Sequence, residues 1–406
     1  MPNASKRILI FTPVFPKLSK GAAEQDQIYG ALQLQRMGHT VRMAAFLPDY
    51  QSPTDVLEYG HTIGLDVVSI PYPATFRSFA SSVKRLAAAL QQPALLDGAA
   101  YQHAHPAILQ FAEEQIGSHR PDLVWLDNNF LWPVALLAKA HGIPVIFRSQ
   151  NFEPAHVLDE GGRSLPNYIR YAGKYLGELT ALRLSTLLVA ITPVEQARYR
   201  RLSRQDKVEL MPLRGLPVHL RPPRPANNRR PLNVFYWGST YNVSHNRAAL
   251  SFVTRDLTSH LRSRAPGEFS LHIFGGKVPA DIQALAADDL IIHGFIPDLE
   301  PELANMNIAL VPSLYGCGMQ QKIFEPLCRG FPTVTSERGL AGYSFLPGRD
   351  VLTAQTAEQF VTHLLELRKP ERRAELSENA SRRAAELFSA ERQAETLDRI
   401  LQRALE

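Results

Sequence analysis

Short apolar runs of strand length alternate with longer segments of helical periodicity, and this alternation occurs twice along the chain. Such alternation produces β-α-β units, in which helices cover a parallel sheet. Several runs are apolar at consecutive positions, as expected for strands buried on both faces. The predicted strands are residues 7–12, 40–46, 65–70, 122–127, 143–147 and 186–191, then 232–238, 269–275, 290–295, 307–313, 331–336 and 350–354.

A proline-rich stretch, PLRGLPVHLRPPRPANNRRPL at residues 212–232, separates the two sets of strands. Prolines there exclude both helix and ladder pairing. A chain of 406 residues suits two domains. We therefore predict an α/β protein with two Rossmann-like, doubly wound domains facing a central cleft, followed by C-terminal helices. The expected boundaries are a first domain at 1–215, a linker at 216–231, a second domain at 232–385 and a helix at 386–406 that could pack back on the first domain.

The charge balance favours anionic ligands over nucleic acid. Lys and Arg number 44 against 39 Asp and Glu, a net charge of +5 without a dense basic patch. The only cysteines, Cys317 and Cys328, cannot form a disulfide framework or a four-ligand zinc site. No stretch approaches the roughly 18 apolar residues of a spanning helix. We expect a cytoplasmic protein whose membrane contact, if any, is peripheral and at the inner face.

The segment VPSLYGCGMQQKIFEPLCRGFPTVTSER, residues 311–338, carries the strongest chemical signal. A strand leads through a glycine-containing loop into a helix that is expected to begin near Met319 and to end at Gly330. Backbone N–H groups and the positive end of the dipole at such a helix start favour a phosphate. Lys322 adds a cation, and Glu325 lies on the same helix face, where sugar or ribose hydroxyls are its natural partners. The alternative is that the two side chains simply pair with each other.

This segment resembles the donor-binding signature of the retaining glycosyltransferases with the two-domain GT-B fold, family 4 (glycosyl transferases group 1), and in particular the bacterial polysaccharide-type subgroup. In that subgroup the run is Gly-x-Gly-Thr-Arg-x-Lys-Ile-x-Glu-Ala, then a helix and Gly-x-Pro-Val-Val-x-Thr. The matching positions are Gly316, Gly318, Lys322, Ile323, Glu325, Gly330, Pro332, Val334 and Thr335. Many members carry an earlier glutamate where this chain has Cys317, and an arginine where it has Gln320.

The resemblance implies a donor site assembled from three segments of the second domain. The helix start at 318–322, with Lys322, would supply positive potential to the diphosphate, backbone amides around Cys317 to Met319 could replace the earlier glutamate at the donor sugar, and Glu325 would bind the ribose. The strand-to-helix turn at 238–246 would face the diphosphate, and the loop at 294–296 would read the base. The implied donor-binding residues are Gly21 from the first domain, with Gly238, Ser239, His245, Asn246, Gly294, Phe295, Ile296, Gly316, Cys317, Gly318, Met319, Gln320, Lys322 and Glu325.

In the first domain, residues 148–156 (RSQNFEPAH) resemble a subgroup signature of the form His-Asn-x-Glu, with Gln150 in place of the histidine. Asn151 and Glu153 are therefore acceptor-side catalytic candidates, with Asp127 at the end of a predicted strand; Lys322 and Glu325 are those on the donor side. Gly21 could let the backbone approach the donor phosphates, or could simply start a helix.

The expected activity is transfer of a sugar from a nucleotide-diphosphate sugar, of UDP or GDP type, to a glycan, lipid-linked or small-molecule acceptor, as in polysaccharide biosynthesis. The resemblance implies retention of anomeric configuration without a metal ion or other cofactor. A sugar-nucleotide epimerase and a non-catalytic binding protein on a degenerate GT-B fold remain as alternatives. An NAD-type oxidoreductase would need a Gly-x-Gly-x-x-Gly turn directly after a strand, which the chain lacks.

Residues 75–90, TFRSFASSVKRLAAAL, place Phe76, Phe79, Val83 and Leu86 at helical spacing with basic residues beside them. An ordinary helix over the core of the first domain explains this pattern. The other interpretation is an amphipathic helix on an anionic membrane, which would reach a lipid-linked acceptor.

Overall fold

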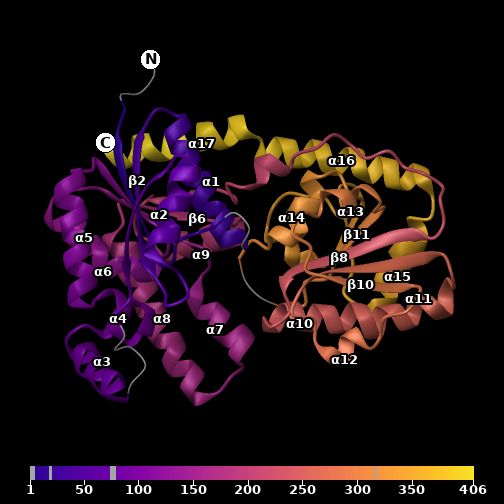
Figure 1. The fold of residues 1–406 in the computed structure, drawn as a ribbon, viewed down its shortest axis with the longest axis horizontal. Coiled ribbons are helices and arrows are strands. Elements are labelled where there is room, and N and C mark those ends of the chain that lie inside the picture. Colours follow the sequence, from indigo (N-terminus) through magenta and orange to yellow (C-terminus); the bar gives the residue numbers. More distant parts are fainter. Residues whose placement is uncertain (1–4, 18–20, 74–78, 316–317) are drawn as a thin grey trace. The chain divides into compact units, whose positions relative to one another are not determined.

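The structure is a computed structural model, and it describes residues 5–17, 21–73, 79–315 and 318–406. The chain divides into two compact units, one made of Met1–Arg214 with Gln393–Glu406 and the other of Gly215–Arg392. Each unit is built around one sheet of parallel strands flanked by helices (Figure 1). The predicted α/β class with two doubly wound sheets is therefore confirmed.

The sheet of the first unit has the strand order β3-β2-β1-β4-β5-β6-β7 among the described residues. All its neighbouring strands pair in parallel. Because β1 pairs with both β2 and β4, the direction of winding reverses between β1 and β4. The strands are β1 (Arg7–Thr12), β2 (Thr40–Leu47), β3 (Asp66–Pro71), β4 (Leu123–Leu126), β5 (Val145–Arg148), β6 (Leu187–Ala190) and β7 (Val208–Leu210).

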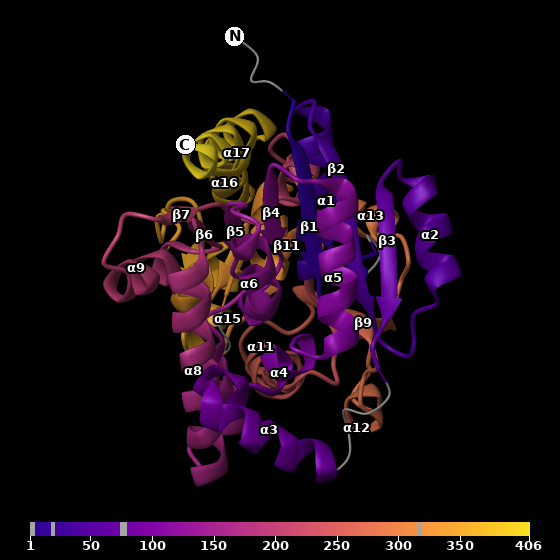
Figure 2. The ribbon, with the colours of Figure 1, turned by 90° about the vertical axis from the view of Figure 1, so that its left-hand side faces the viewer.

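Helices cover both faces of this sheet, and each face has its own hydrophobic core (Figure 2). Strand β1 serves both cores, since Leu9 and Phe11 join one and Ile8 and Ile10 join the other. The first core takes residues from α5, α6, α8 and α9, and the second from α1, α2 and α17. The helices are α1 (Ala22–Arg36), α2 (Pro53–Thr62), α3 (Phe79–Gln91), α4 (Gly98–His103), α5 (Pro106–His119), α6 (Trp132–Ala140), α7 (Glu153–Gly161), α8 (Leu165–Leu184), α9 (Pro193–Leu202) and α17 (Ala390–Leu405).

The sheet of the second unit has the order β10-β9-β8-β11-β12-β13, again parallel throughout the described pairs. Its winding reverses between β8 and β11. Ligands of doubly wound sheets bind at the carboxyl ends of the strands beside such a reversal. The strands are β8 (Leu232–Thr240), β9 (Phe269–Gly276), β10 (Leu290–Gly294), β11 (Ile308–Val311), β12 (Thr333–Thr335) and β13 (Leu352–Thr353).

In the second unit α10, α11 and α12 lie on one side of the sheet, and α13, α14 and α16 lie on the other (Figure 1). A π-helical turn at Phe252–Leu257 joins α10 to α11, and a 3-10 helix at Leu216–His219 (η4) opens the unit. The helices are α10 (Ser244–Ser251), α11 (Thr258–Arg264), α12 (Ala280–Gln283), α13 (Glu300–Ala304), α14 (Gln321–Cys328), α15 (Ala357–Glu366) and α16 (Pro370–Phe388).

Every predicted strand overlaps an observed one, and most observed strands are shorter, although β2, β3, β8 and β9 extend beyond their predicted ends. Strand β7 was missed because its three residues, Val208–Leu210, are too few for a pattern. Ser389 separates α16 from α17 in an extended conformation. Residues 220–230 of the proline-rich stretch form neither helix nor strand.

Four charged side chains are buried together in the first unit. Asp26 of α1 accepts bonds from Arg148 and Arg214, and Arg214 also donates to Asp127 at 3.3 Å. Burial alone would raise the pKa of Asp26, but the two guanidinium groups hold that pKa well below its usual range. Helix α1 can pass this cluster only because residue 30 is glycine: a Cβ there would lie 2.0 Å from the Arg214 guanidinium.

Gly30→Ala is therefore expected to destabilise the protein although alanine favours helices. The methyl group must displace a buried, paired guanidinium, at a cost of about 2–4 kcal/mol. The matched control is Gly117→Ala in α5, where an added Cβ meets nothing within 4 Å. That substitution should leave stability unchanged or raise it by up to about 1 kcal/mol. Urea unfolding of both variants measures the difference, and equal effects would contradict this packing account.

Candidate functional site

Helix α14 follows β11, one of the two strands between which the winding reverses, and packs its apolar side against the sheet. Ile323, Phe324 and Leu327 are buried against the unit's core, which leaves Lys322 and Glu325 on the partly exposed side. The helix begins at Gln321, two residues later than predicted, and no side chain caps its first turn. Gly318 in the preceding loop has φ +76°, a left-handed conformation that favours glycine. A strand, a glycine-containing loop and an uncapped helix start therefore meet beside β8.

A proline inside α14 fixes the backbone of Lys322. Pro326 has no N–H group, so the carbonyl of Lys322, four residues earlier, loses its helical partner. The indole Nε1–H of Trp237, near the end of β8, donates to that carbonyl instead, at 2.9 Å. This bond ties the first turn of α14 to the neighbouring reversal strand.

The side chain of Lys322 is largely but not fully buried, and it has no anionic partner among the described residues. It donates to Oδ1 of Asn246 at 2.8 Å and lies 5.7 Å from the centre of the Tyr236 ring. Among the residues that the structure describes, no carboxylate forms an ion pair with it. Burial lowers the pKa of Lys322 to about 8. A desolvated cation facing neutral groups is a favourable position for an anion.

Glu325 does not pair with Lys322, so that alternative is excluded for the described conformation. Its Oε1 accepts from Nε of Arg329 at 3.0 Å, and its Oε2 accepts from Nε2 of Gln321 at 3.0 Å. His219 of η4 lies 3.3 Å from Oε1. The carboxylate is thus fixed on the same helix, one turn beyond the Lys322 ammonium.

The turn after β8 brings one predicted donor residue, Asn246, directly to Lys322, and Asn246 also donates to the carbonyl of Thr240. Gly238 lies against the Tyr241 ring, where a Cβ would come within 3.1 Å, and Ser239 is exposed. The ring of His245 faces that of Tyr315 edge-on, 6.5 Å away.

The predicted base-reading loop follows β10. Gly294 has φ +74°, Phe295 is 65% exposed and Ile296 is half-buried. Exposure of a large aromatic ring at this position leaves an apolar surface open to a ligand.

The predicted loop residues before α14 are only partly placed. Gln320 donates through Nε2 to Ser313 Oγ at 2.9 Å, and Met319 is buried. Gly316 and Cys317 lie outside the described residues, so the consequence of the cysteine at that position is not assigned.

In the first unit, Asp127 belongs to the buried charge cluster beside Arg214 and accepts from Nε1 of Trp125 at 2.9 Å. Burial raises the pKa of Asp127. Its side chain is 1% exposed, which makes it a support for the end of β4. Gly21 is the N-cap residue of α1 with φ −78°, a conformation open to any residue.

Two buried carboxyl groups accept hydrogen bonds from the backbone of the segment that contains Asn151 and Glu153. The N–H of Glu153 donates to Glu178, and the N–H of Phe152 donates to Glu195. Burial raises the pKa of Glu178 to about 8 and that of Glu195 to about 7. The carbonyl of Asn151 accepts from the Ser149 hydroxyl, at 3.0 Å.

The Glu153 carboxylate lies 3.1 Å from the ammonium of Lys174, which also approaches Asp97. Burial opposes the charge on Lys174, but the two carboxylates raise its pKa. The candidate acceptor-side residues are therefore placed by α8 and α9.

Sequence reasoning missed several of these groups. No local sequence motif marks Trp237, His219 or Arg329. Trp237 contacts Lys322 and His219 contacts Arg329 across long sequence separations, and Arg329 contacts Glu325 from the next turn of α14. One signal was present: a proline at the helix position where the subgroup has alanine.

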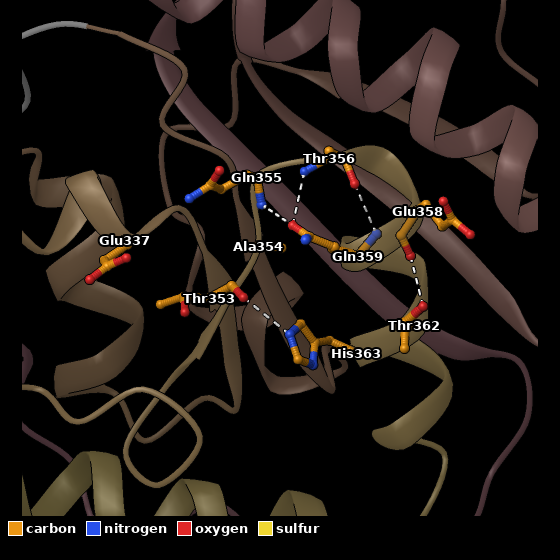
Figure 3. A pocket seen from close by; sticks show the side chains of 9 residues that line it. All are labelled: Glu337, Thr353, Ala354, Gln355, Thr356, Glu358, Gln359, Thr362 and His363. Atoms are coloured by element: carbon orange, nitrogen blue, oxygen red, sulfur yellow. Dashed lines mark hydrogen bonds between the residues drawn. The ribbon is translucent and has the colours of Figure 1, made fainter.

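A cavity of about 540 Å³ lies beside the edge strand β13 (Figure 3). Several of its polar side chains have partners within the protein: Gln359 and Thr356 form a capping box at the start of α15, and His363 bonds to the carbonyl of Thr353. Two strands separate it from the winding reversal, so we do not assign the predicted donor site to it. Nor do the described residues contain a cluster of three or more His, Cys, Asp or Glu arranged to hold a metal ion.

Two family models match the chain. Residues 31–214 match the model described as "Glycosyl transferase 4-like domain", and residues 232–369 match "Glycosyl transferases group 1". No curated protein matches the sequence.

Solved structures resemble it over nearly their whole length. They include Anabaena HepE in complex with UDP and glucose, with 13% identity, a TM-score of 0.66 and coverage of 98% of this chain and 99% of that one. Sucrose-phosphate synthase from Thermosynechococcus elongatus has 15% identity, a TM-score of 0.67 and 98% coverage of both chains. Staphylococcus aureus TarM, with fondaparinux, α-GlcNAc-glycerol and UDP, has 10% identity, a TM-score of 0.65 and coverage of 97% and 99%.

The Trp237 bond to the Lys322 carbonyl can be tested with a double-mutant cycle. Trp237→Phe should destabilise the second unit by about 1–3 kcal/mol beyond the loss of ring area, because the carbonyl stays buried and unpaired. Pro326→Ala restores a helical N–H donor to that carbonyl, so the Trp237→Phe penalty should shrink in the Pro326→Ala background. Chemical unfolding of the four proteins measures the coupling. Strict additivity would show that the bond is energetically irrelevant.

Proposed function

The chain belongs to the group 1 glycosyltransferases, and we propose that its second unit binds a UDP-sugar at the start of α14. One observation carries the proposal: among the described residues no carboxylate pairs with the largely buried ammonium of Lys322, which lies beside the winding reversal of the sheet. A diphosphate supplies the missing negative charge, and the uncapped first turn of α14 adds N–H donors. UDP is the nucleotide in the complexes of HepE and TarM, and it is our choice for this chain.

Glu325 completes the donor site in this proposal. It lies one helical turn from Lys322, so a carboxylate oxygen can accept from ribose hydroxyls while the ammonium faces the diphosphate. The loop at Gly294–Ile296 would contact the base, with the turn at Gly238, Ser239 and His245 beside the phosphates. Gly318, Met319 and Gln320 would bring backbone amides to the same group.

The proposed reaction breaks the bond between the anomeric carbon and the diphosphate oxygen and forms one to an acceptor hydroxyl oxygen. The acceptor proton passes to the departing diphosphate, and attack on the face that the diphosphate leaves retains the configuration. Positive potential from Lys322 and α14 stabilises the charge that develops on the leaving group. We propose that this potential suffices without a metal ion, and that Asn151 and Glu153 orient the acceptor.

The competing functions are not favoured. An epimerase and a non-catalytic binding protein would both use the fold, but the two family models and the solved neighbours describe glycosyltransferases. The acceptor is proposed only as a class, a glycan, a lipid-linked sugar or a small hydroxyl compound. Tighter binding of GDP than of UDP would instead indicate a GDP-sugar donor.

The affinity for UDP should depend on pH through Lys322. Its pKa of about 8 means that the free protein loses the ammonium charge above that pH, while bound diphosphate favours the charged form. UDP affinity should therefore fall above pH 8, by up to about tenfold per unit. Lys322→Met should bind about 10–100-fold more weakly at pH 7 and show no such fall.

Isothermal titration with UDP and GDP between pH 7 and 9.5 measures these affinities. UDP at one hundred times its dissociation constant should stabilise the wild type by about 2.7 kcal/mol, which raises its melting temperature. Glu325→Ala should lose most of this rise in melting temperature. UDP binding that is equal in wild type and Lys322→Met would refute the proposed site.

We also propose peripheral contact of the first unit with an anionic membrane. Val83, Leu86 and Leu90 of α3 are exposed, Leu90 by 88%, and so are Leu165 and Ile169 of α8. Both segments lie at the same end of the unit (Figures 1 and 2). Residues 79–92 and 161–176 contain no Asp or Glu but include Lys84, Arg85, Arg163 and Arg170. Phe76 and the side chain of Phe79 lie outside the described part of the chain, and no described helix could span a bilayer.

The double variant Leu86→Ser with Leu90→Ser should lose sedimentation with vesicles that contain phosphatidylglycerol, because the apolar anchor is removed while the charge remains. The control is Leu57→Ser, which changes an exposed leucine of α2, and this variant should sediment as the wild type does. Unchanged sedimentation of the double variant, or none by the wild type, would exclude this surface.

A further inference from the structure

The Glu325 carboxylate is oriented by the protein before any ligand binds. Arg329 reaches Oε1 with both Nε and Nη2, each at 3.0 Å, and Gln321 reaches Oε2. The side chains of Glu325 and Arg329 are 15% and 10% exposed. The donors of a planar guanidinium have fixed directions, so this bond orients a carboxylate better than a freely rotating ammonium can.

Arg329 is in turn held by two other elements. Its Nη1 donates to Glu300 of α13 at 2.6 Å, and its Nη2 lies 3.1 Å from Nδ1 of His219 in η4. Burial lowers the pKa of His219, which favours a neutral imidazole whose Nδ1 accepts from Arg329. Glu325, Glu300 and His219 thus surround one guanidinium, so its orientation does not depend on a ligand.

This arrangement uses the two carboxylate oxygens unequally. A carboxylate offers about four acceptor positions, two on each oxygen. Oε1 accepts from Nε of Arg329 and also lies 3.0 Å from its Nη2 and 3.3 Å from Nδ1 of His219, whereas Oε2 contacts only the Gln321 amide among the described residues. The remaining acceptor capacity is on Oε2.

We propose that Arg329 is a positioning residue for nucleotide recognition, which holds Oε1 so that Oε2 accepts from the ribose hydroxyls, with Glu300 and His219 as its supports. The inference rests on the proposed UDP site. It assigns a function to three residues that do not themselves touch the ligand.

Comparison of UDP with 2′,3′-dideoxy-UDP separates this function from a merely structural one. The wild type should bind UDP about tenfold more tightly, because the dideoxy compound lacks the hydroxyls that Glu325 would bind. Arg329→Gln should bring the ratio of the two dissociation constants close to one while changing the affinity for the dideoxy compound less than threefold. Arg262→Gln, which breaks the surface pair with Asp289, is the control and should keep the wild-type ratio.

Each outcome decides a different point. Failure of the wild type to bind either nucleotide overturns the proposed site itself. A wild type that binds both equally, or an Arg329→Gln protein that keeps the tenfold ratio, overturns the inference but leaves the diphosphate site intact. If Arg329→Gln does not fold, Glu300→Gln tests the same clamp at a more exposed residue, and an unchanged ratio there overturns it equally.

Discussion

The proposed donor site depends on one charge without a carboxylate partner among the described residues, the largely buried ammonium of Lys322. A desolvated cation without a carboxylate partner is unfavourable in an unliganded protein, and the fall of its pKa to about 8 expresses that cost. The surrounding structure nevertheless fixes it firmly, since Asn246 binds the ammonium and Trp237 binds the carbonyl of the same residue. We interpret the unfavourable charge as a site prepared for an anion.

The first unit shows the contrasting case. There Arg148 and Arg214 are buried more deeply than Lys322, but Asp26 and Asp127 lie beside them. Paired charges of this kind specify packing, as the missing side chain at Gly30 illustrates, and they leave little attraction for a ligand. A buried charge therefore does not by itself indicate a binding site. We take a buried charge that lacks a partner of opposite charge as the better indication.

The sequence was sufficient for the fold and for one helix. Both sheets follow from apolar strands alternating with helices, and the loop with Gly318 followed by Lys322 and Glu325 marked the helix start. The contacts of these residues could not be predicted, because they join distant segments: Asn246 is 76 positions from Lys322, and His219 is 110 from Arg329. The expected position of Asp127 was correct at a strand end, but its burial beside Arg214 depends on a residue 87 positions away. Only packing determines such pairs.

A crystal structure of the protein with UDP tests the central claim most directly. The account predicts a diphosphate oxygen about 3 Å from the Lys322 ammonium, with the ribose beside Glu325. Nucleotide bound elsewhere, with Lys322 still facing only Asn246, would contradict it.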